Sequence, residues 1–409
     1  MTHLATAASH RPLRARTEGI DAPTDLLAHL GRDGFAWCDD DVAFVTSGVA
    51  ARVRATDVAA TLERIEHHTG SSDGAASAPV GPIAVGALPF ADADRGGLFV
   101  PAVVVGTDRA GRAWRTEITG PGVSSVEPAL HPAATRPTRF TFRAQPPVAE
   151  WERQVRAAVE RIRAGALAKV VLARHLELDA DLPFAVRAIV EVLRRTQPGS
   201  TVYAHGGFVG ASPELLVRRR GHAVESRPMA GTVARGASRP DDDRAAAALL
   251  ESTKDADEHR LVVDAVTGVL DGWCDDVRAD GPIAARFASV THLATHVTGR
   301  LRDATKATAL DLALALHPTP AVAGTPTPAA LALLHELEGR DRDRYAGPVG
   351  WVHANGDGEF AVALRCAHLD GTHARLTAGA GIVADSDPAA EWAETQAKLE
   401  PMLQALVRG

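Results

Sequence analysis

The part of the chain after residue 148 mixes amphipathic helices with apolar strands, and this mixture most limits the folds open to it. Four apolar residues recur at helical spacing, namely Trp151, Val155, Val159 and Ile162. Residues 169–178 then predict a strand, 183–195 a helix and 257–270 an amphipathic helix. Because strands and helices do not alternate strictly, as they do in a parallel α/β fold, the pattern predicts an α+β fold.

The 409 residues predict one large domain preceded by a short tail. Residues 1–20 carry no regular pattern and predict a loosely ordered tail, and 21–409 predict the domain. Within it, 21–144 is a variable N-terminal part and 145–409 carries the motifs. Residues 232–243, with three consecutive aspartates, predict a mobile polar loop. A last helix is predicted from 388 to 407, and Pro401 should bend or break it.

Composition excludes several classes of protein. The net charge is −7, the pI is about 6.2 and no basic block is present, so nucleic acid is not an expected partner. No stretch reaches the ~18 apolar residues of a membrane span, and the N-terminus lacks the apolar core of a signal peptide. Cys38, Cys274 and Cys366 are far apart in the sequence, which indicates reduced thiols and a cytoplasmic protein.

Lysine is rare in this chain. Of the 44 cationic residues only four are lysine, namely Lys169, Lys254, Lys306 and Lys398. An ammonium group can lose its proton near neutral pH in a suitable site, whereas a guanidinium group cannot. Lys169 and Lys398 are therefore candidates for reactive groups. A codon bias towards arginine explains the same counts, and composition alone favours that explanation.

Two predicted helices carry carboxylates that could meet. Glu391, Glu394 and Lys398 share one face of the last helix, although a Glu394–Lys398 pair is also typical of an exposed helix surface. Glu258 lies in an acidic helical turn, which the helix dipole favours without any function. The functional alternative is a Mg²⁺ site in which Glu258 and Glu394 supply one oxygen each.

Glu214 follows a glycine-rich strand end in Ser-Pro-Glu. It is either a turn residue or a general acid with a raised pKa. Together with a neutral Lys169, it would provide one proton donor and one proton acceptor.

Taken in order, the motifs of residues 145–409 resemble those of the chorismate-utilising enzymes, most closely the isochorismate synthases of the siderophore type. The motifs are Lys169-Val-Val-Leu-Ala-Arg, Gly210-Ala-Ser-Pro-Glu214, Met229-Ala-Gly231-Thr232, Lys254-Asp-Ala-Asp-Glu258-His259, His292-Leu-Ala-Thr, His317-Pro-Thr-Pro-Ala321, Tyr345-Ala-Gly-Pro-Val-Gly, Leu364-Arg365-Cys-Ala, Gly379-Ala-Gly381 and Glu391-Trp-Ala-Glu394-Thr. The N-terminal third matches only loosely.

The resemblance implies a single domain of two stacked antiparallel sheets, flanked by helices, with the site between them. It implies Mg²⁺-dependent conversion of chorismate to isochorismate, in which Lys169 activates water for attack on C2 and Glu214 protonates the departing C4 hydroxyl. Glu258 and Glu394 would bind Mg²⁺, with Glu391 and Asp255 in the outer shell.

The implied substrate contacts surround the ring and its two carboxylates. They are Gly231, Thr232 and Lys398 at the ring carboxylate, Tyr345, Arg365 and Gly379 at the enolpyruvyl carboxylate, and His292 and Ala321 at the ring. Chorismate is a dianion, so Mg²⁺ and the bidentate fork of Arg365 would supply one countercharge for each carboxylate.

Single residues distinguish members of the family. Lys169 points to water as the nucleophile, because the relatives that use ammonia, which normally need a glutaminase partner, lack this lysine. Ala321 favours isochorismate synthase, since salicylate synthases typically have threonine there. Tyr345 and Leu364 instead resemble salicylate-forming relatives, which also eliminate pyruvate.

Two alternatives therefore stay open, a salicylate synthase and a non-catalytic relative that binds chorismate. The intact set of buried ionisable residues argues against the second alternative. We expect a monomer without a glutaminase subunit. The sequence does not distinguish a role in siderophore synthesis from one in menaquinone synthesis.

Overall fold

The computed structural model describes residues 12–69, 79–123, 136–236, 238–305 and 307–409. The helices are α1 (Val58–Glu63), α2 (Val148–Arg163), α3 (Val186–Thr196), α4 (Arg239–Glu251), α5 (Thr253–Leu270), α6 (Ala309–Leu316), α7 (Thr327–Glu338) and α8 (Pro388–Arg408). The strands are β1 (Arg14–Ile20), β2 (Phe35–Cys38), β3 (Val42–Arg54), β4 (Glu66–Thr69), β5 (Ile83–Ala87), β6 (Gly97–Asp108), β7 (Ala113–Thr119), β8 (Phe140–Gln145), β9 (Lys169–Ala180), β10 (Thr201–His205), β11 (Phe208–Ser212), β12 (Leu215–Arg220), β13 (Ala223–Arg227), β14 (Met229–Ala234), β15 (Cys274–Arg286), β16 (Val290–Leu301), β17 (Gly324–Thr325), β18 (Pro348–His353), β19 (Gly358–Val362), β20 (Cys366–Asp370) and β21 (His373–Ile382).

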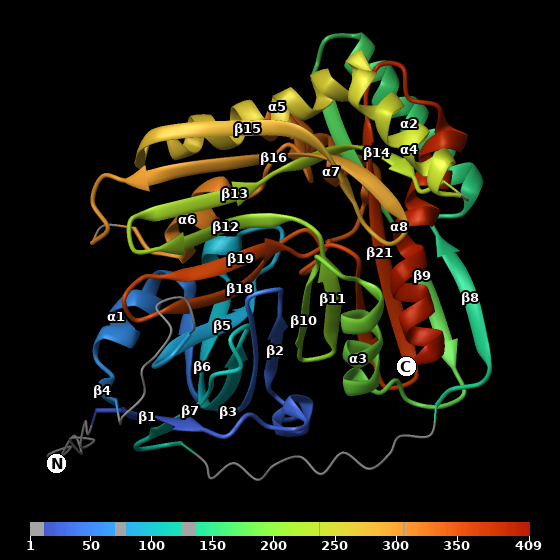
Figure 1. The fold of residues 1–409 in the computed structure, drawn as a ribbon. Coiled ribbons are helices and arrows are strands. Elements are labelled where there is room, and N and C mark those ends of the chain that lie inside the picture. The colour runs from blue at the N-terminus through green and yellow to red at the C-terminus, as the bar shows by residue number, and fades with distance from the viewer. Residues whose placement is uncertain (1–11, 70–78, 124–135, 237, 306) are drawn as a thin grey trace, which may run out of the picture.

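The strands form two wings that meet at β6. One wing runs from β6 through β5, β18, β19, β12, β13 and β16 to β15, and the other through β3, β2, β10, β11, β20, β21 and β9 to β8. We call these the first wing and the second wing (Figure 1). All these pairings are antiparallel, which confirms the α+β class. The two sheets that we expected are one continuous network, because the 12-residue strand β6 pairs with both β3 and β5.

Two hydrophobic cores hold the layers together. The first contains residues of both wings, for example Val217 and Trp351 from the first wing and Trp37 and Leu172 from the second. The second core joins α3 and α8 to the outer face of the second wing. Burial of apolar side chains at about 25 cal/mol per Å² is the main stabilising contribution of such cores.

The predicted tail is too long. Residues 1–11 lie outside the described residues, but Arg14–Ile20 forms β1, which pairs with β7 and with β4. Side chains of β1 alternate between exposed and buried, and those of Ala15 and Thr17 are almost fully buried. Burial of this face fixes the segment in the sheet, although its sequence is not strongly apolar.

Helix α8 continues through Pro401, so the predicted break does not occur. Proline cannot donate to the carbonyl four residues earlier, here that of Ala397. The Oγ atom of Ser289 lies 3.4 Å from this carbonyl oxygen and donates to it instead. Because the freed acceptor is satisfied and Pro401 is buried, the helix passes the proline and carries its charged N-terminal half to the site.

Candidate active site

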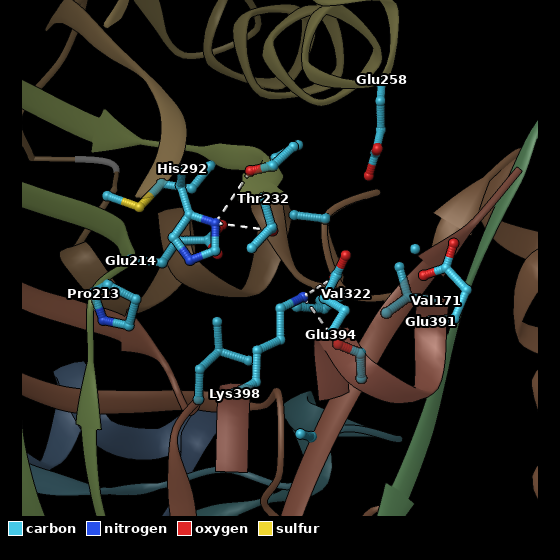
Figure 2. Close-up of a pocket in the computed structure, with 18 of the residues that line it drawn as sticks. Val171, Pro213, Glu214, Thr232, Glu258, His292, Val322, Glu391, Glu394 and Lys398 are labelled. Carbon is cyan, nitrogen blue, oxygen red and sulfur yellow. Dashed lines mark hydrogen bonds and ion pairs between the residues drawn. The ribbon is translucent and has the colours of Figure 1, made fainter. Parts of the chain in front are cut away.

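A cavity of about 280 Å³ lies where the first wing, the second wing, α5 and α8 come together, and Figure 2 shows residues that line it. All fourteen residues singled out from the sequence line it. They are Lys169, Glu214, Gly231, Thr232, Asp255, Glu258, His292, Ala321, Tyr345, Arg365, Gly379, Glu391, Glu394 and Lys398. The motifs are spread over more than 200 positions of sequence, so only the fold brings these side chains to one place.

Lys169 begins β9 and is 1% exposed. Its Nζ atom forms an ion pair with Oε1 of Glu258, from α5, at 2.7 Å. Gly381 on the neighbouring strand β21 makes room for this pair, since a Cβ atom there would lie 2.7 Å from the same Oε1 atom and 3.0 Å from Lys169 Cε. The charge of the buried ammonium group is therefore balanced by one carboxylate, and the pair lies at the wall of the cavity.

Glu214 lies in the turn between β11 and β12 and is 4% exposed. Its backbone N–H donates to Oγ of Ser212 at 3.2 Å, which fixes the turn. Burial raises the pKa of the carboxyl group from 4.5 to about 8, against the opposing influence of Lys169, Lys398 and Arg227. Glu214 consequently carries a proton at neutral pH and can act as an acid.

The acidic side of the cavity is built from α5 and α8. Glu394 Oε1 pairs with Lys398 Nζ at 2.5 Å, and this ammonium group also donates to the carbonyl of Gly379 at 3.0 Å. Burial and the charge of Glu394 raise the pKa of Glu391 to about 7. Figure 2 shows Glu258 reaching towards the cavity from α5, opposite the two glutamates of α8.

Within the described residues, no three His, Cys, Asp or Glu side chains are close enough together to hold a metal ion. Glu258 pairs with Lys169, and Glu394 pairs with Lys398. The chemistry of the donors still fits a hard divalent cation, since carboxylate oxygens face one cavity and Glu391 is crowded by Glu394. Ser252 caps α5, because its Oγ atom accepts from the backbone N–H of Asp255, and the same hydroxyl donates to the Asp255 carboxylate.

His292 connects two parts of the site. Its Nε2 atom lies 3.0 Å from Nη2 of Arg365, and its Nδ1 atom lies 3.2 Å from the carbonyl oxygen of Gly231. A guanidinium group only donates, so Nε2 accepts and Nδ1 carries the proton. Burial, with a contribution from Arg365, lowers the pKa of His292 well below its usual value, so the ring is neutral.

Arg365 offers a free donor to an anion. The residue has a left-handed backbone conformation with φ of 50°, which is rare for a residue with a side chain. Its Nη1 atom is buried and has no hydrogen-bond partner among the described residues. Burial lowers the pKa of the guanidinium group only to about 10, so it remains charged. A buried cation with an unused donor is suited to bind a carboxylate of a ligand.

Three of the four lysines, Lys169, Lys254 and Lys398, line the cavity, and Lys306 lies outside the described residues. Codon bias does not explain this location. Lys254 also lines the cavity but was not predicted to do so. Its position directly before Asp255, which was predicted, could have indicated it. Val171 was also missed, although two-residue alternation along β9 puts it on the same face as Lys169.

Comparison with known proteins agrees with this geometry. The sequence profile described as "Chorismate binding enzyme" matches residues 114–407, well over half of the chain. The chain belongs to this family. Within it, a Mycobacterium tuberculosis relative designated MenF is 40% identical over 390 residues, which is 91% of this chain and 95% of the relative. Isochorismate synthase DhbC of Bacillus subtilis is 35% identical over 80% of this chain and 81% of its own length.

Two solved structures share the fold. The menaquinone-specific isochorismate synthase MenF of Escherichia coli superposes with a TM-score of 0.83 and 26% identity, over 97% of this chain and 95% of the other. Anthranilate synthase component I of Streptococcus pneumoniae superposes with a TM-score of 0.66 at 22% identity, and this supports the fold alone.

Proposed function

We propose that this chain is an enzyme that converts chorismate to isochorismate by adding water at C2 and removing the hydroxyl group at C4. One observation carries the proposal. A buried lysine, Lys169, and a glutamate that keeps its proton at neutral pH, Glu214, line the same cavity as the unpaired donor of Arg365. The family relatives named isochorismate synthases support the same reaction.

The cavity has charges for both carboxylates of the substrate. The unused Nη1 donor of Arg365 would bind the enolpyruvyl carboxylate, close to Tyr345 and to the backbone of Gly379. Lys398 would lie near the ring carboxylate, with the backbone of Gly231 and Thr232. Fixing a dianion at both ends orients its ring between base and acid, and this positioning is a large part of catalysis.

Lys169, in its neutral form, would take a proton from the attacking water, and Glu214 would give its proton to the departing C4 hydroxyl. One water enters and one water leaves, so atoms and protons balance over the two groups. Mg²⁺, when bound by Glu258 and Glu394 with Glu391 and Asp255 around them, would supply positive charge to the ring carboxylate. Burial of the cavity strengthens these electrostatic interactions.

Replacing Glu394 by glutamine is expected to raise the Mg²⁺ concentration for half-maximal activity at least about tenfold, because an oxygen ligand loses its charge. Mg²⁺ titrations of activity and of binding heat would measure the change. Glu400→Gln on the same helix is the matched control, since Glu400 does not line the cavity. Identical Mg²⁺ titrations for Glu394→Gln and the wild type would refute this ligand assignment.

Activity should fall as the pH rises through about 8. Glu214 donates only when protonated, and its raised pKa places the loss of that proton near this pH. A profile of kcat/KM from pH 6 to pH 10 would test this expectation. A rate that stays constant to pH 10 would argue against Glu214 as the acid.

Product analysis decides between the candidate activities. Incubation with chorismate and Mg²⁺, followed by chromatography, should yield isochorismate as the main product. Stoichiometric pyruvate with salicylate would favour a salicylate synthase, for which the cavity residues Tyr345 and Leu364 are the specific observation. Unchanged chorismate would favour a non-catalytic relative. Ala321 lines the cavity with its small side chain, and this supports the synthase.

We also propose that the enzyme is cytoplasmic and acts as a monomer without a glutaminase subunit. Cys38, Cys274 and Cys366 are free and buried, which suits a reducing compartment. No helix within the described residues is long and apolar enough to cross a membrane.

A further inference from the structure

The edge of β9 that faces away from β21 has a gap in its strand pairing. β17 pairs with Lys169 and Val170, and Ala323 accepts from the N–H of Val171 at 2.9 Å. β8 pairs with β9 only from His175 onwards. Between these two partners, the carbonyl of Val171 and the N–H of Ala173 face no strand. Buried backbone groups of this kind need other partners.

An ion pair of side chains fills the gap. Glu338, the last residue of α7, accepts from the N–H of Ala173 at 2.8 Å, and Nη2 of Arg342 donates to the carbonyl of Val171 at 2.5 Å. Arg342 also donates through Nε to Glu338 at 2.9 Å. The pair thus makes the two hydrogen bonds that a neighbouring strand would make with β9.

The same guanidinium group reaches two further walls of the cavity. Its Nη1 atom donates at 2.7 Å to the carbonyl of Val322, next to Ala321. Its central carbon lies 6.0 Å from the ring centre of Tyr345, the second of these walls. The same carbon lies 4.6 Å from the ring centre of Phe90, which packs behind the wall and does not line the cavity. Val171, Val322 and Tyr345 all line the cavity, whereas Arg342 is 5% exposed and does not.

Only arginine suits these contacts. A planar guanidinium group presents five donors in a fixed fork, so it can serve two carbonyls and a carboxylate at once, whereas the ammonium group of lysine is a single point. Lys169 and Val171 are two residues apart on one strand and share a face. A shift of β9 at Val171 therefore moves the Lys169 side chain relative to Ala321 and Tyr345.

We propose that Arg342 is a positioning residue for the isomerisation, which ties β9, the Ala321–Val322 segment and Tyr345 into one fixed arrangement around the ring of the substrate. This inference rests on the proposed function. None of these bonds joins Arg342 to Arg365 or Lys398, the charged groups proposed to hold the carboxylates, and Arg342 approaches Tyr345 only through the ring contact at 6.0 Å. Its loss should therefore lower kcat more than it raises KM.

The test compares Arg342→Lys with Arg340→Lys, an exposed neighbour that leaves the walls untouched. Arg342→Lys should lower kcat about 100-fold per folded molecule, because a displacement of about 1 Å between reacting groups has an effect of this size. KM should change less than about threefold. Arg340→Lys should match the wild type. Folding is followed by thermal melting, and rates are measured well below the transition.

Arg342→Ala with added guanidinium ion gives a second measurement if the lysine variant folds poorly. Millimolar guanidinium should restore part of kcat in this variant, whereas urea at the same concentration should not. A wild-type kcat in folded Arg342→Lys would overturn the proposal. The proposal would also fail if two results occurred together. In the first, the lower activity of Arg342→Lys is explained entirely by its smaller folded fraction; in the second, guanidinium does not restore kcat in Arg342→Ala.

Hydrogen exchange separates this inference from the proposed function. In Arg342→Lys, amides of residues 169–173 and 321–323 should exchange faster, with other strands unchanged. If the wild type forms no isochorismate, the proposed function fails, and the exchange pattern still decides whether Arg342 holds these walls. Unchanged exchange in both segments would refute the inference even in an active enzyme.

Discussion

Lys169→Ala is expected to lose turnover by a factor on the order of 10²–10⁴, the usual contribution of a positioned general base. The side chain lies almost fully buried at the cavity wall. Removing it also leaves Glu258 without its ion-pair partner. Turnover should be measured as isochorismate formed per folded molecule, with folding checked by circular dichroism.

Lys169→Arg is the matched control for charge. An arginine keeps a positive partner for Glu258 but cannot lose its proton in a protein. If Lys169 acts as a base, both variants are inactive while Lys169→Arg melts near the wild-type temperature. Substantial activity in Lys169→Arg would show that this position needs only a positive charge, and the base assignment would be wrong.

Glu214→Gln should lower turnover by a similar factor, about 10²–10⁴, because an amide of nearly the same shape cannot protonate the leaving hydroxyl. The buried turn that holds the side chain is fixed by backbone hydrogen bonds, so the variant should fold. Glu225→Gln, on β13 and outside the cavity, is the matched control. Full turnover in Glu214→Gln would remove Glu214 from the mechanism.

The same variant should change how stability depends on pH. The pKa of Glu214 is about 8 in the folded protein and 4.5 as the ordinary value. A raised carboxyl pKa stabilises the fold fully below about pH 4.5, and this contribution is lost as the pH rises to about 8. The wild type should therefore lose stability between pH 5 and pH 8 relative to Glu214→Gln. Parallel melting curves for the two proteins across this range would contradict the raised pKa.

Local sequence patterns predicted the elements with strong periodicity but missed those that depend on neighbours. The apolar stripe of α2 and the capped helix α8 were correctly placed. Residues 232–243 were expected to form a loop, yet α4 begins at Arg239. Ser238 caps this helix and accepts from the N–H of Asp241, and Asp241 and Asp242 occupy its first turn, where the helix dipole favours them.

The candidate site was predictable in its members but not in its contacts. Family motifs named fourteen of the residues that line the cavity, because each motif keeps its residues at fixed spacing. The ion pair of Lys169 with Glu258 and the tautomer of His292 depend on strands and helices far apart in sequence. The role of Glu338 and Arg342 depends on a gap between β17 and β8, which no local pattern indicates.

Turnover of chorismate in ¹⁸O-labelled water tests most directly whether Lys169 and Glu214 exchange a ring hydroxyl for water. At early conversion, the wild type should give isochorismate with one solvent oxygen, located on C2, and Lys169→Arg should give no labelled product. Isochorismate that contains no solvent oxygen would contradict the account.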